Sequence, residues 1–177
     1  DQELGDDESH AVTELLNFVT EYERIGDYAV NIMEKSEELY EKEASFSDHA
    51  KEQLKLLTSA MERILDLTND AFENDDLTLA RQVEPLEEVI DIMVEKLRDQ
   101  HIKRLKDGIC SIDTGVVFLD VLNNAERISD HCSNIAVAII ELESDSFDTH
   151  EYLSSVRAMK SHSFARYYEE YQQKYHL

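Results

Sequence analysis

Apolar residues recur at alternating steps of three and four along most of the chain, and this spacing is the strongest constraint on its fold. A side chain returns to the same face of an α-helix about every 3.6 residues, so each such run predicts one amphipathic helix. The 177 residues include four Gly, one Pro and no Trp, which is too few turn residues for an all-β fold. We therefore expect an all-α fold.

The runs predict five helices, at roughly 8–43, from 48 to the polar stretch at 73–76, and at 77–106, 112–143 and 149–177. Ser47 or Asp48 is suited to cap the second helix, and Gly108 to end the third. Pro85, the only proline, should kink the third helix or restart it. In the first helix we expect a buried row of Val12, Leu15, Val19, Tyr22, Gly26, Ala29 and Met33.

The chain is strongly acidic, with 17 Lys and Arg against 40 Asp and Glu and a formal net charge of −23. Such a charge repels phosphate backbones and anionic lipids, so we expect no nucleic-acid partner. No apolar run of about 18 residues and no basic leader segment is present, so we expect no membrane insertion by this segment.

The first residue, Asp1, suggests a piece of a longer product. Cys110 and Cys132 are too few for a disulfide framework, which favours a reducing cytosolic environment.

An internal repeat links the first and fourth helices. Residues 23–32 align with residues 126–135, with Glu, Arg, Ile, Asp, Asn and Ile identical among the ten positions. An offset of 103 residues indicates a duplicated multi-helix unit rather than a solenoid repeat. The repeated set is polar, Glu-x-x-x-Asp-x-x-x-Asn, and a helix places these residues in one column.

Two acidic side chains four residues apart at the inner edge of a helix repel each other, more so when buried. Arg24 and Arg127 directly follow the repeated glutamates, but adjacent residues on a helix point about 100° apart. A bound cation is therefore the better neutralising partner. A third pair of the same form interrupts an apolar face of the third helix. The candidate metal ligands are Glu23 and Asp27, Glu126 and Asp130, and Glu87 and Asp91.

A solvated acidic face stays open as the alternative, because chance acidic pairs are common in so acidic a chain. All-carboxylate sites suit Mg, Ca, Mn or Fe, and the sequence does not choose among them. His101 and His131 are more typical of buried or boundary histidines than of ligands. The chain has no glycine-rich phosphate loop, zinc-binding helix motif, EF-hand loop or readable nucleophile arrangement.

Residues 149–177 differ from the rest, because they carry a net charge near +1 and five of the eight tyrosines. Their aromatic residues lie at helical spacing. They are consistent with a fifth helix that packs on the bundle or, alternatively, with a helix that docks on a partner.

The repeated Glu-Arg-Ile-x-Asp motifs, the segments at 83–91 and 101–105, and the aromatic tail resemble PhoU-domain proteins. Within that family they resemble the cytoplasmic PhoU-like domain that follows the membrane part of bacterial sodium/phosphate cotransporter-family proteins. The resemblance implies an elongated antiparallel helix bundle of three-helix repeats with an extra C-terminal amphipathic helix. It also implies multinuclear metal clusters at the acidic motifs, with iron in some members.

On this resemblance, 1–177 is a single PhoU-like domain in which 8–43 is the last helix of a first repeat. Residues 48–143 form the second repeat, and 149–177 form the C-terminal helix. The implied role is regulatory and non-enzymatic, in phosphate transport at the cytoplasmic face of the membrane. The implied partners are the transporter portion of the same polypeptide or complex and further copies of the chain. A carboxylate-bridged metal-dependent enzyme and a purely structural interaction module are the alternatives.

Overall fold

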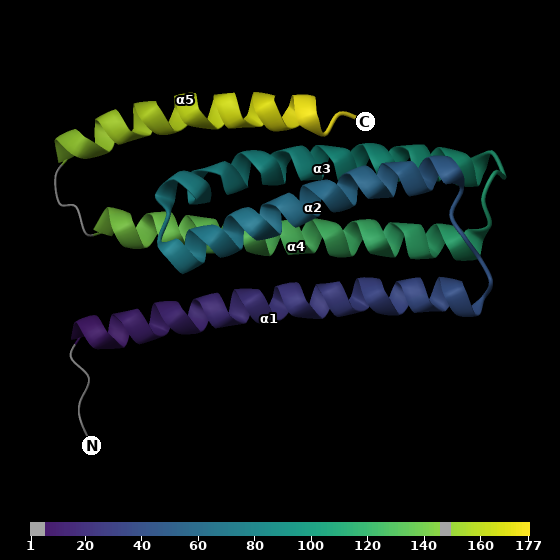
Figure 1. The fold of residues 1–177 in the computed structure, drawn as a ribbon, viewed down its shortest axis with the longest axis horizontal. Helices are drawn as coiled ribbons and strands as arrows, with labels where there is room; N and C mark the ends of the chain where they lie inside the picture. Colours follow the sequence, from purple (N-terminus) through teal and green to yellow (C-terminus); the bar gives the residue numbers. More distant parts are fainter. Residues whose placement is uncertain (1–5, 146–149) are drawn as a thin grey trace, which may run out of the picture.

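The structure is a computed structural model that describes the backbone of residues 6–145 and 150–177, and the side chains of residues 9, 11–142 and 162–177. The described residues are helical except at the turns, which confirms the predicted all-α class. Figure 1 shows the helices lying side by side in an elongated antiparallel arrangement. They are α1 (Asp6–Glu41), α2 (Asp48–Asn74), α3 (Leu77–Lys106), α4 (Ile112–Asp145) and α5 (His150–Lys174).

The centre of the fold is a three-helix unit in which α2, α3 and α4 all pack on one another. On its two sides α1 packs along α4, and α5 packs along α3 (Figure 1). The rows that the spacing of three and four predicts in the second and fourth helices face this centre and are buried, or nearly so. They are Ala50, Leu54, Leu57, Met61, Ile64, Thr68 and Ala71 in α2, and Phe118, Val121, Leu122, Ala125, Ser129, Cys132, Ala136 and Ile139 in α4. The fully buried large side chains are Ile64, Leu67, Val83, Leu86, Ile90, Val94, Leu97, Val117, Phe118, Leu122 and Ile135.

The helix ends follow the sequence signals. The Ser47 hydroxyl caps α2 by accepting a hydrogen bond from the Ala50 N–H at 3.2 Å. Asp76 caps α3, and Gly108 follows α3 with a φ of 69°, a left-handed conformation that glycine adopts without strain. Pro85 lies inside α3 and is buried, so the predicted restart of the helix at this residue is wrong. Asp76, nine residues before the proline, caps the helix, so the helix has already begun when it reaches Pro85.

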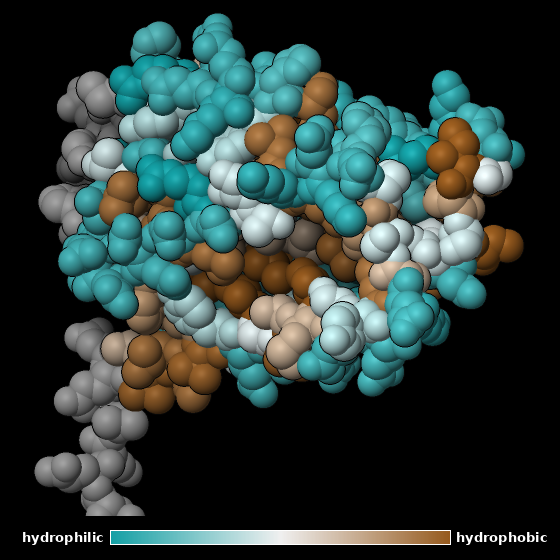
Figure 2. Space-filling model, turned by 45° about the vertical axis from the view of Figure 1, so that its right-hand side comes forward, coloured by the Kyte–Doolittle hydropathy of each residue, from teal (hydrophilic) through white to brown (hydrophobic). Residues whose placement is uncertain are grey.

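The apolar row predicted for the first helix is largely wrong. Val12, Leu15, Val19 and Met33 are 45–57% exposed, whereas Phe18 is 6% exposed. The physical reason is that α1 packs on one side only, so its opposite face meets no other described helix. Figure 2 shows hydrophobic side chains exposed over the N-terminal part of α1, at the lower left.

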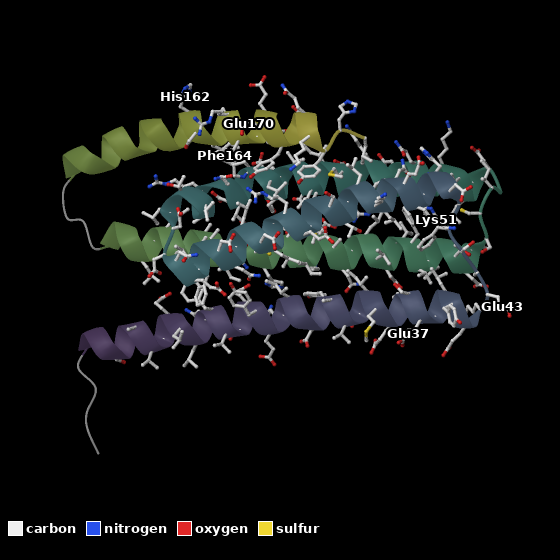
Figure 3. All side chains as sticks on the ribbon, in the orientation of Figure 1. Glu37, Glu43, Lys51, His162, Phe164 and Glu170 are labelled. Carbon is white, nitrogen blue, oxygen red and sulfur yellow. The ribbon has the colours of Figure 1, made fainter. Side chains whose placement is uncertain are left out.

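The C-terminal helix packs on the bundle through the part whose side chains are described. Tyr171 and Tyr175 are buried, and the Tyr171 hydroxyl donates a hydrogen bond to Gln82 Oε1 of α3 at 2.9 Å. Figure 3 shows Phe164 on the side of α5 that faces α3 and His162 on the opposite side. This contact supports the packing-helix interpretation of the aromatic tail.

Two glycines give a test of the packing with opposite expected signs. A Cβ at Gly115 in α4 would lie 2.7 Å from Leu105 Cδ2 and 3.0 Å from His101 Nε2, whereas a Cβ at Gly26 would meet nothing within 4 Å. We expect Gly115→Ala to lower the free energy of unfolding by about 1 kcal/mol, because overpacking outweighs the gain in helix propensity.

For Gly26→Ala we expect an increase of about 0.5 kcal/mol, because the helix propensity improves without a steric cost. Urea unfolding of the two variants beside the parent chain measures both changes. A stabilising Gly115→Ala would contradict the close contact between α3 and α4 at this end.

Candidate metal centre

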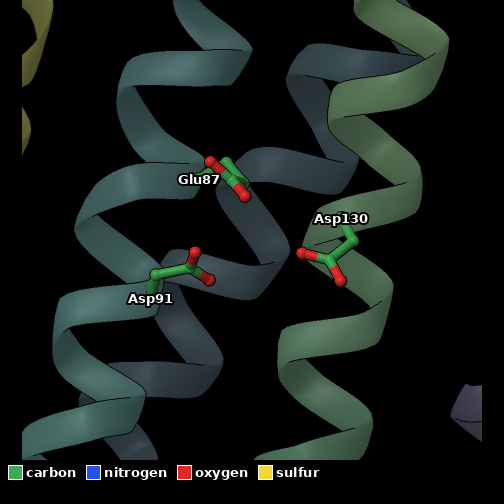
Figure 4. Close-up of side chains that lie close together, drawn as sticks. All are labelled: Glu87, Asp91 and Asp130. Carbon is green, nitrogen blue, oxygen red and sulfur yellow. The ribbon is translucent and has the colours of Figure 1, made fainter.

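Three of the predicted carboxylates come together between two helices. Glu87 and Asp91 lie one turn apart on α3, and Asp130 lies opposite them on α4. One oxygen of each side chain lies within 4.8 Å of the others. Figure 4 shows the three side chains converging in the space between α3 and α4. We call these three residues the carboxylate cluster.

The helix packing explains why this cluster forms. On α3, Glu87 shares a face with Val83 and Ile90, which are buried, so it is drawn toward the interior. On α4, Ser129 and His131 flank Asp130 and are themselves buried, which leaves Asp130 at the edge of the α3–α4 contact. All three carboxylates are consequently half-buried.

Partial burial and mutual repulsion disfavour the charged forms. Burial, followed by repulsion from Asp91 and Asp130, raises the pKa of Glu87 to about 7. Burial and then repulsion from Asp130 and Glu126 raise the pKa of Asp91 to about 6. The pKa of Asp130 is also raised, chiefly by burial, although nearby Arg127 acts in the opposite direction.

The cluster has the donor set of a site for a hard cation. It offers carboxylate oxygens alone, which suit Mg, Ca, Mn or Fe ions. Two oxygens bound to one cation at about 2.3–2.6 Å can lie up to about 5 Å apart, which accommodates the observed separation. The buried Oδ1 of Asp91 has no hydrogen-bond partner, so this atom is free to accept a cation. The residues present therefore fit a metal ion.

Glu126, another predicted ligand, has a protein partner instead. Its Oε2 accepts a hydrogen bond from Arg98 Nη2 of α3 at 2.8 Å, and the same guanidinium nitrogen donates to Asn123 at 3.0 Å. Arg127 lies 3.6 Å from Asp130 rather than beside Glu126. No sequence motif marked Arg98, since its role depends on how α3 packs against α4.

The structure does not bring Glu23 and Asp27 to the carboxylate cluster. Both side chains are exposed on α1, and no group of three potential ligands among the described side chains includes them. The two copies of the repeat motif thus lie in different environments. Helix α4 has neighbours on both sides, whereas α1 packs mainly along α4, and the face of α1 that carries Glu23 and Asp27 is exposed.

The two histidines have structural partners, as the sequence favoured. The His131 ring is buried at the α1–α4 contact, where Nδ1 lies 2.5 Å from Glu21 Oε2 and the ring stacks on Tyr28. His101 Nε2 lies 3.2 Å from the Gly115 carbonyl oxygen. Glu21, which the sequence analysis missed, also accepts a hydrogen bond from Asn134 at 3.2 Å.

The raised pKa values predict how pH affects the metal-free protein. Between about pH 4.5 and 7 the folded chain binds protons at Glu87 and Asp91 that the unfolded chain has released. Unfolding should therefore become easier as the pH rises through this window. We expect Glu87→Gln to raise the free energy of unfolding at pH 8 by about 1 kcal/mol, a value that allows for solvent screening.

Glu88→Gln is the matched control, because Glu88 is the neighbouring residue on the same helix and is exposed. It should shift the pH profile of urea unfolding far less than Glu87→Gln. Equal profiles for the two variants would show that Glu87 is as well solvated as Glu88.

The described part of the chain contains no helix that is both long and apolar enough to span a lipid bilayer.

The PhoU domain model matches residues 47–139, which is more than half of the chain. The chain is 32% identical, over 132 residues, to "Phosphate-specific transport system accessory protein PhoU homolog 1" of Thermotoga maritima. That match covers 73% of this chain and 55% of the relative, so the chain spans about half the length of that protein. No solved structure matches the chain significantly. The chain belongs to the PhoU domain family.

Proposed function

We propose that this chain is a non-enzymatic regulatory domain for phosphate transport that holds a metal ion at Glu87, Asp91 and Asp130. The observation that carries the metal proposal is the carboxylate cluster, with its unpartnered Asp91 oxygen and its raised pKa values. The transport role rests on the family and on the name of the Thermotoga relative, an accessory protein of a phosphate transport system.

The proposed context is the cytoplasmic face of the membrane, next to a sodium/phosphate cotransporter-like portion of the same polypeptide or complex. The support for this context is the similarity of the repeated Glu-Arg-Ile-x-Asp motifs and the aromatic tail to that group of proteins. Copies of the domain would associate there, although the strongly negative charge of the chain makes isolated copies repel one another. Bound cations would reduce that repulsion.

The residues of the cluster suggest how metal would act on the fold. A bound cation supplies positive charge that three converging carboxylates need at neutral pH. Glu87 and Asp91 would hold it from α3, and Asp130 would hold it from α4. The proposed consequence is a tighter α3–α4 contact, so that metal supply could change the surface the domain offers to a transporter.

The test replaces the chromosomal copy with the Asp91→Asn/Asp130→Asn variant in the native host and measures phosphate uptake at low and high external phosphate. We expect the parent chain to lower uptake when phosphate is plentiful and the variant to lose this response. Arg98→Gln/Glu126→Gln, which alters the neighbouring ion pair outside the cluster, is the control and should keep it. An unchanged response in the cluster variant would overturn the proposal, as would phosphatase turnover that disappears on metal removal.

A further inference from the structure

A second candidate site lies at the end of the bundle where two chain turns meet. A cavity of about 420 Å³ opens between the α1–α2 turn, the last turns of α3 and the start of α4. Both turns lie at the right-hand end in Figure 1. Figure 2, which brings this end forward, shows hydrophobic side chains among hydrophilic ones there. We call this space the end cavity.

The lining of the end cavity contains no acidic side chain. This is unusual in a chain in which 40 of 177 residues are Asp or Glu. The lining combines one guanidinium, one imidazole, hydroxyl groups and an apolar wall. Its members are Ala44, Ser45, Phe46, Ser47, Ala50, His101, Arg104, Ile109, Cys110, Ser111, Thr114 and Phe118.

Arg104 is the cationic group of this cavity, and no carboxylate of the described residues pairs with it. Its Nη1 donates to Gln53 Oε1 at 3.4 Å, and its Nη2 lies 3.5 Å from His101 Nδ1. The guanidinium also lies 5.6 Å from the ring centre of Phe118. These long contacts hold the group in place but supply no negative charge. A guanidinium normally acquires a carboxylate or phosphate partner, so Arg104 is positioned for one.

His101 positions Arg104 rather than competing with it. The His101 side chain is 2% exposed, and Nε2 lies 3.2 Å from the Gly115 carbonyl oxygen. A carbonyl accepts, so Nε2 must carry the hydrogen and Nδ1 is left to accept from Arg104. Burial and the adjacent guanidinium lower the pKa of His101, which keeps the ring neutral near pH 7.

The start of α4 adds a weaker attraction for anions. Ser111 precedes this helix, and its hydroxyl accepts a hydrogen bond from the Thr114 N–H at 3.2 Å. The first N–H groups of a helix carry partial positive charge. The only acidic residue of this first turn, Asp113, is exposed and does not line the cavity. The start of α4 therefore attracts an anion in the end cavity, as Arg104 does.

We propose that the end cavity binds a small molecule that carries a phosphate group and an uncharged, partly apolar body. The phosphate would contact Arg104, and the body would lie against Phe46, Phe118 and Ile109. A cavity of this volume is in the range of sites for small organic ligands and exceeds what inorganic phosphate needs. Thirteen residues, or about 20 Å of α3, separate Arg104 from Asp91. The end cavity is therefore distinct from the carboxylate cluster.

The binding test uses phenyl phosphate, inorganic phosphate and phenol as probes, titrated calorimetrically into the metal-free full chain. We expect phenyl phosphate to bind most tightly and phenol at least about tenfold more weakly, because the cavity selects the charged group. Inorganic phosphate should also bind more weakly, because it lacks the apolar body. No saturable binding of phenyl phosphate up to about 10 mM would overturn the proposal, as would equal affinities for all three probes.

The variant test compares Arg104→Gln with Lys103→Gln. Both remove one positive charge from the last turns of α3, but Lys103 is exposed and does not line the cavity. We expect Arg104→Gln to weaken phenyl phosphate binding about tenfold or more, and Lys103→Gln to weaken it less than about twofold. If the two variants lost the same affinity for phenyl phosphate, the effect would come from the overall charge of the chain, and the proposed site would be wrong.

A third measurement uses the parent chain, so its result does not depend on whether the Arg104→Gln variant folds correctly. Cys110 lines the cavity, whereas Cys132 is buried and its pKa is raised to about 12 by burial, so only Cys110 should react with iodoacetamide. Saturating phenyl phosphate should slow alkylation of Cys110 at least about threefold by occupying the cavity. An alkylation rate that phenyl phosphate leaves unchanged would overturn the assignment of the ligand to this cavity.

Discussion

Addition of Mn²⁺ or Fe²⁺ should raise the melting temperature of the metal-free chain by roughly 5–10 °C at a hundredfold excess over the dissociation constant. This shift corresponds to about 2.7 kcal/mol of binding linked to folding. The physical reason is that three half-buried carboxylates repel one another and Asp91 has an unpartnered buried oxygen. The unfolded chain does not bring the three groups together. The measurement is a melting titration followed by circular dichroism.

Two controls separate binding at the cluster from general screening. NaCl of matched ionic strength relaxes the repulsion among exposed charges but does not bridge α3 and α4. The Asp91→Asn/Asp130→Asn variant should lose the metal-specific part of the shift. The Glu23→Gln/Asp27→Asn variant should keep it, because those two side chains are exposed on α1 and outside the cluster. If NaCl reproduces the whole shift, the carboxylates form a solvated face.

Truncation of a core leucine should cost more than truncation of a leucine on the outer face of α1. Leu97 of α3 is 0% exposed, whereas Leu16 of α1 is 61% exposed. We expect Leu97→Ala to lower the free energy of unfolding by about 2–5 kcal/mol, through lost burial and the cavity left behind. Leu16→Ala, with the same atoms removed, should change it by less than about 0.5 kcal/mol.

Urea unfolding at low protein concentration gives both values from the midpoint and slope. Repeating it at a hundredfold higher concentration tests whether copies of the chain cover α1. A cost for Leu16→Ala that approaches the cost for Leu97→Ala would mean that another surface buries the outer face of α1 in solution.

Periodicity predicted most of the fold because a helix needs only local information. The steps of three and four in α2 and α4 identified residues that the structure buries, and Ser47 and Gly108 lie where a cap and a helix end are required. The same periodicity failed in α1, because an amphipathic row does not reveal whether a second helix covers it. Val12 and Leu15 continue the row and are nevertheless exposed.

The candidate site shows the same division between local pattern and packing. The sequence predicted six candidate ligands: Glu87 and Asp91 as an acidic pair on the third helix, and the repeated pairs Glu23 and Asp27, and Glu126 and Asp130. Only the packing of α3 on α4 distinguishes them, because it draws three carboxylates within 4.8 Å of one another. The cost of their repulsion, seen in the raised pKa values of Glu87 and Asp91, arises from that approach.

The sequence by itself determined the helix content, the helix ends, the duplicated Glu-x-x-x-Asp motif and the resemblance to PhoU domains, since each depends on residues close together in the chain. The tertiary structure decided which copy of the motif enters a carboxylate cluster. It also decided that Arg98 pairs with Glu126 and that Arg104 faces a cavity without acids. These outcomes depend on contacts between helices distant in sequence, where burial and the nearest opposite charge set the energy of each group.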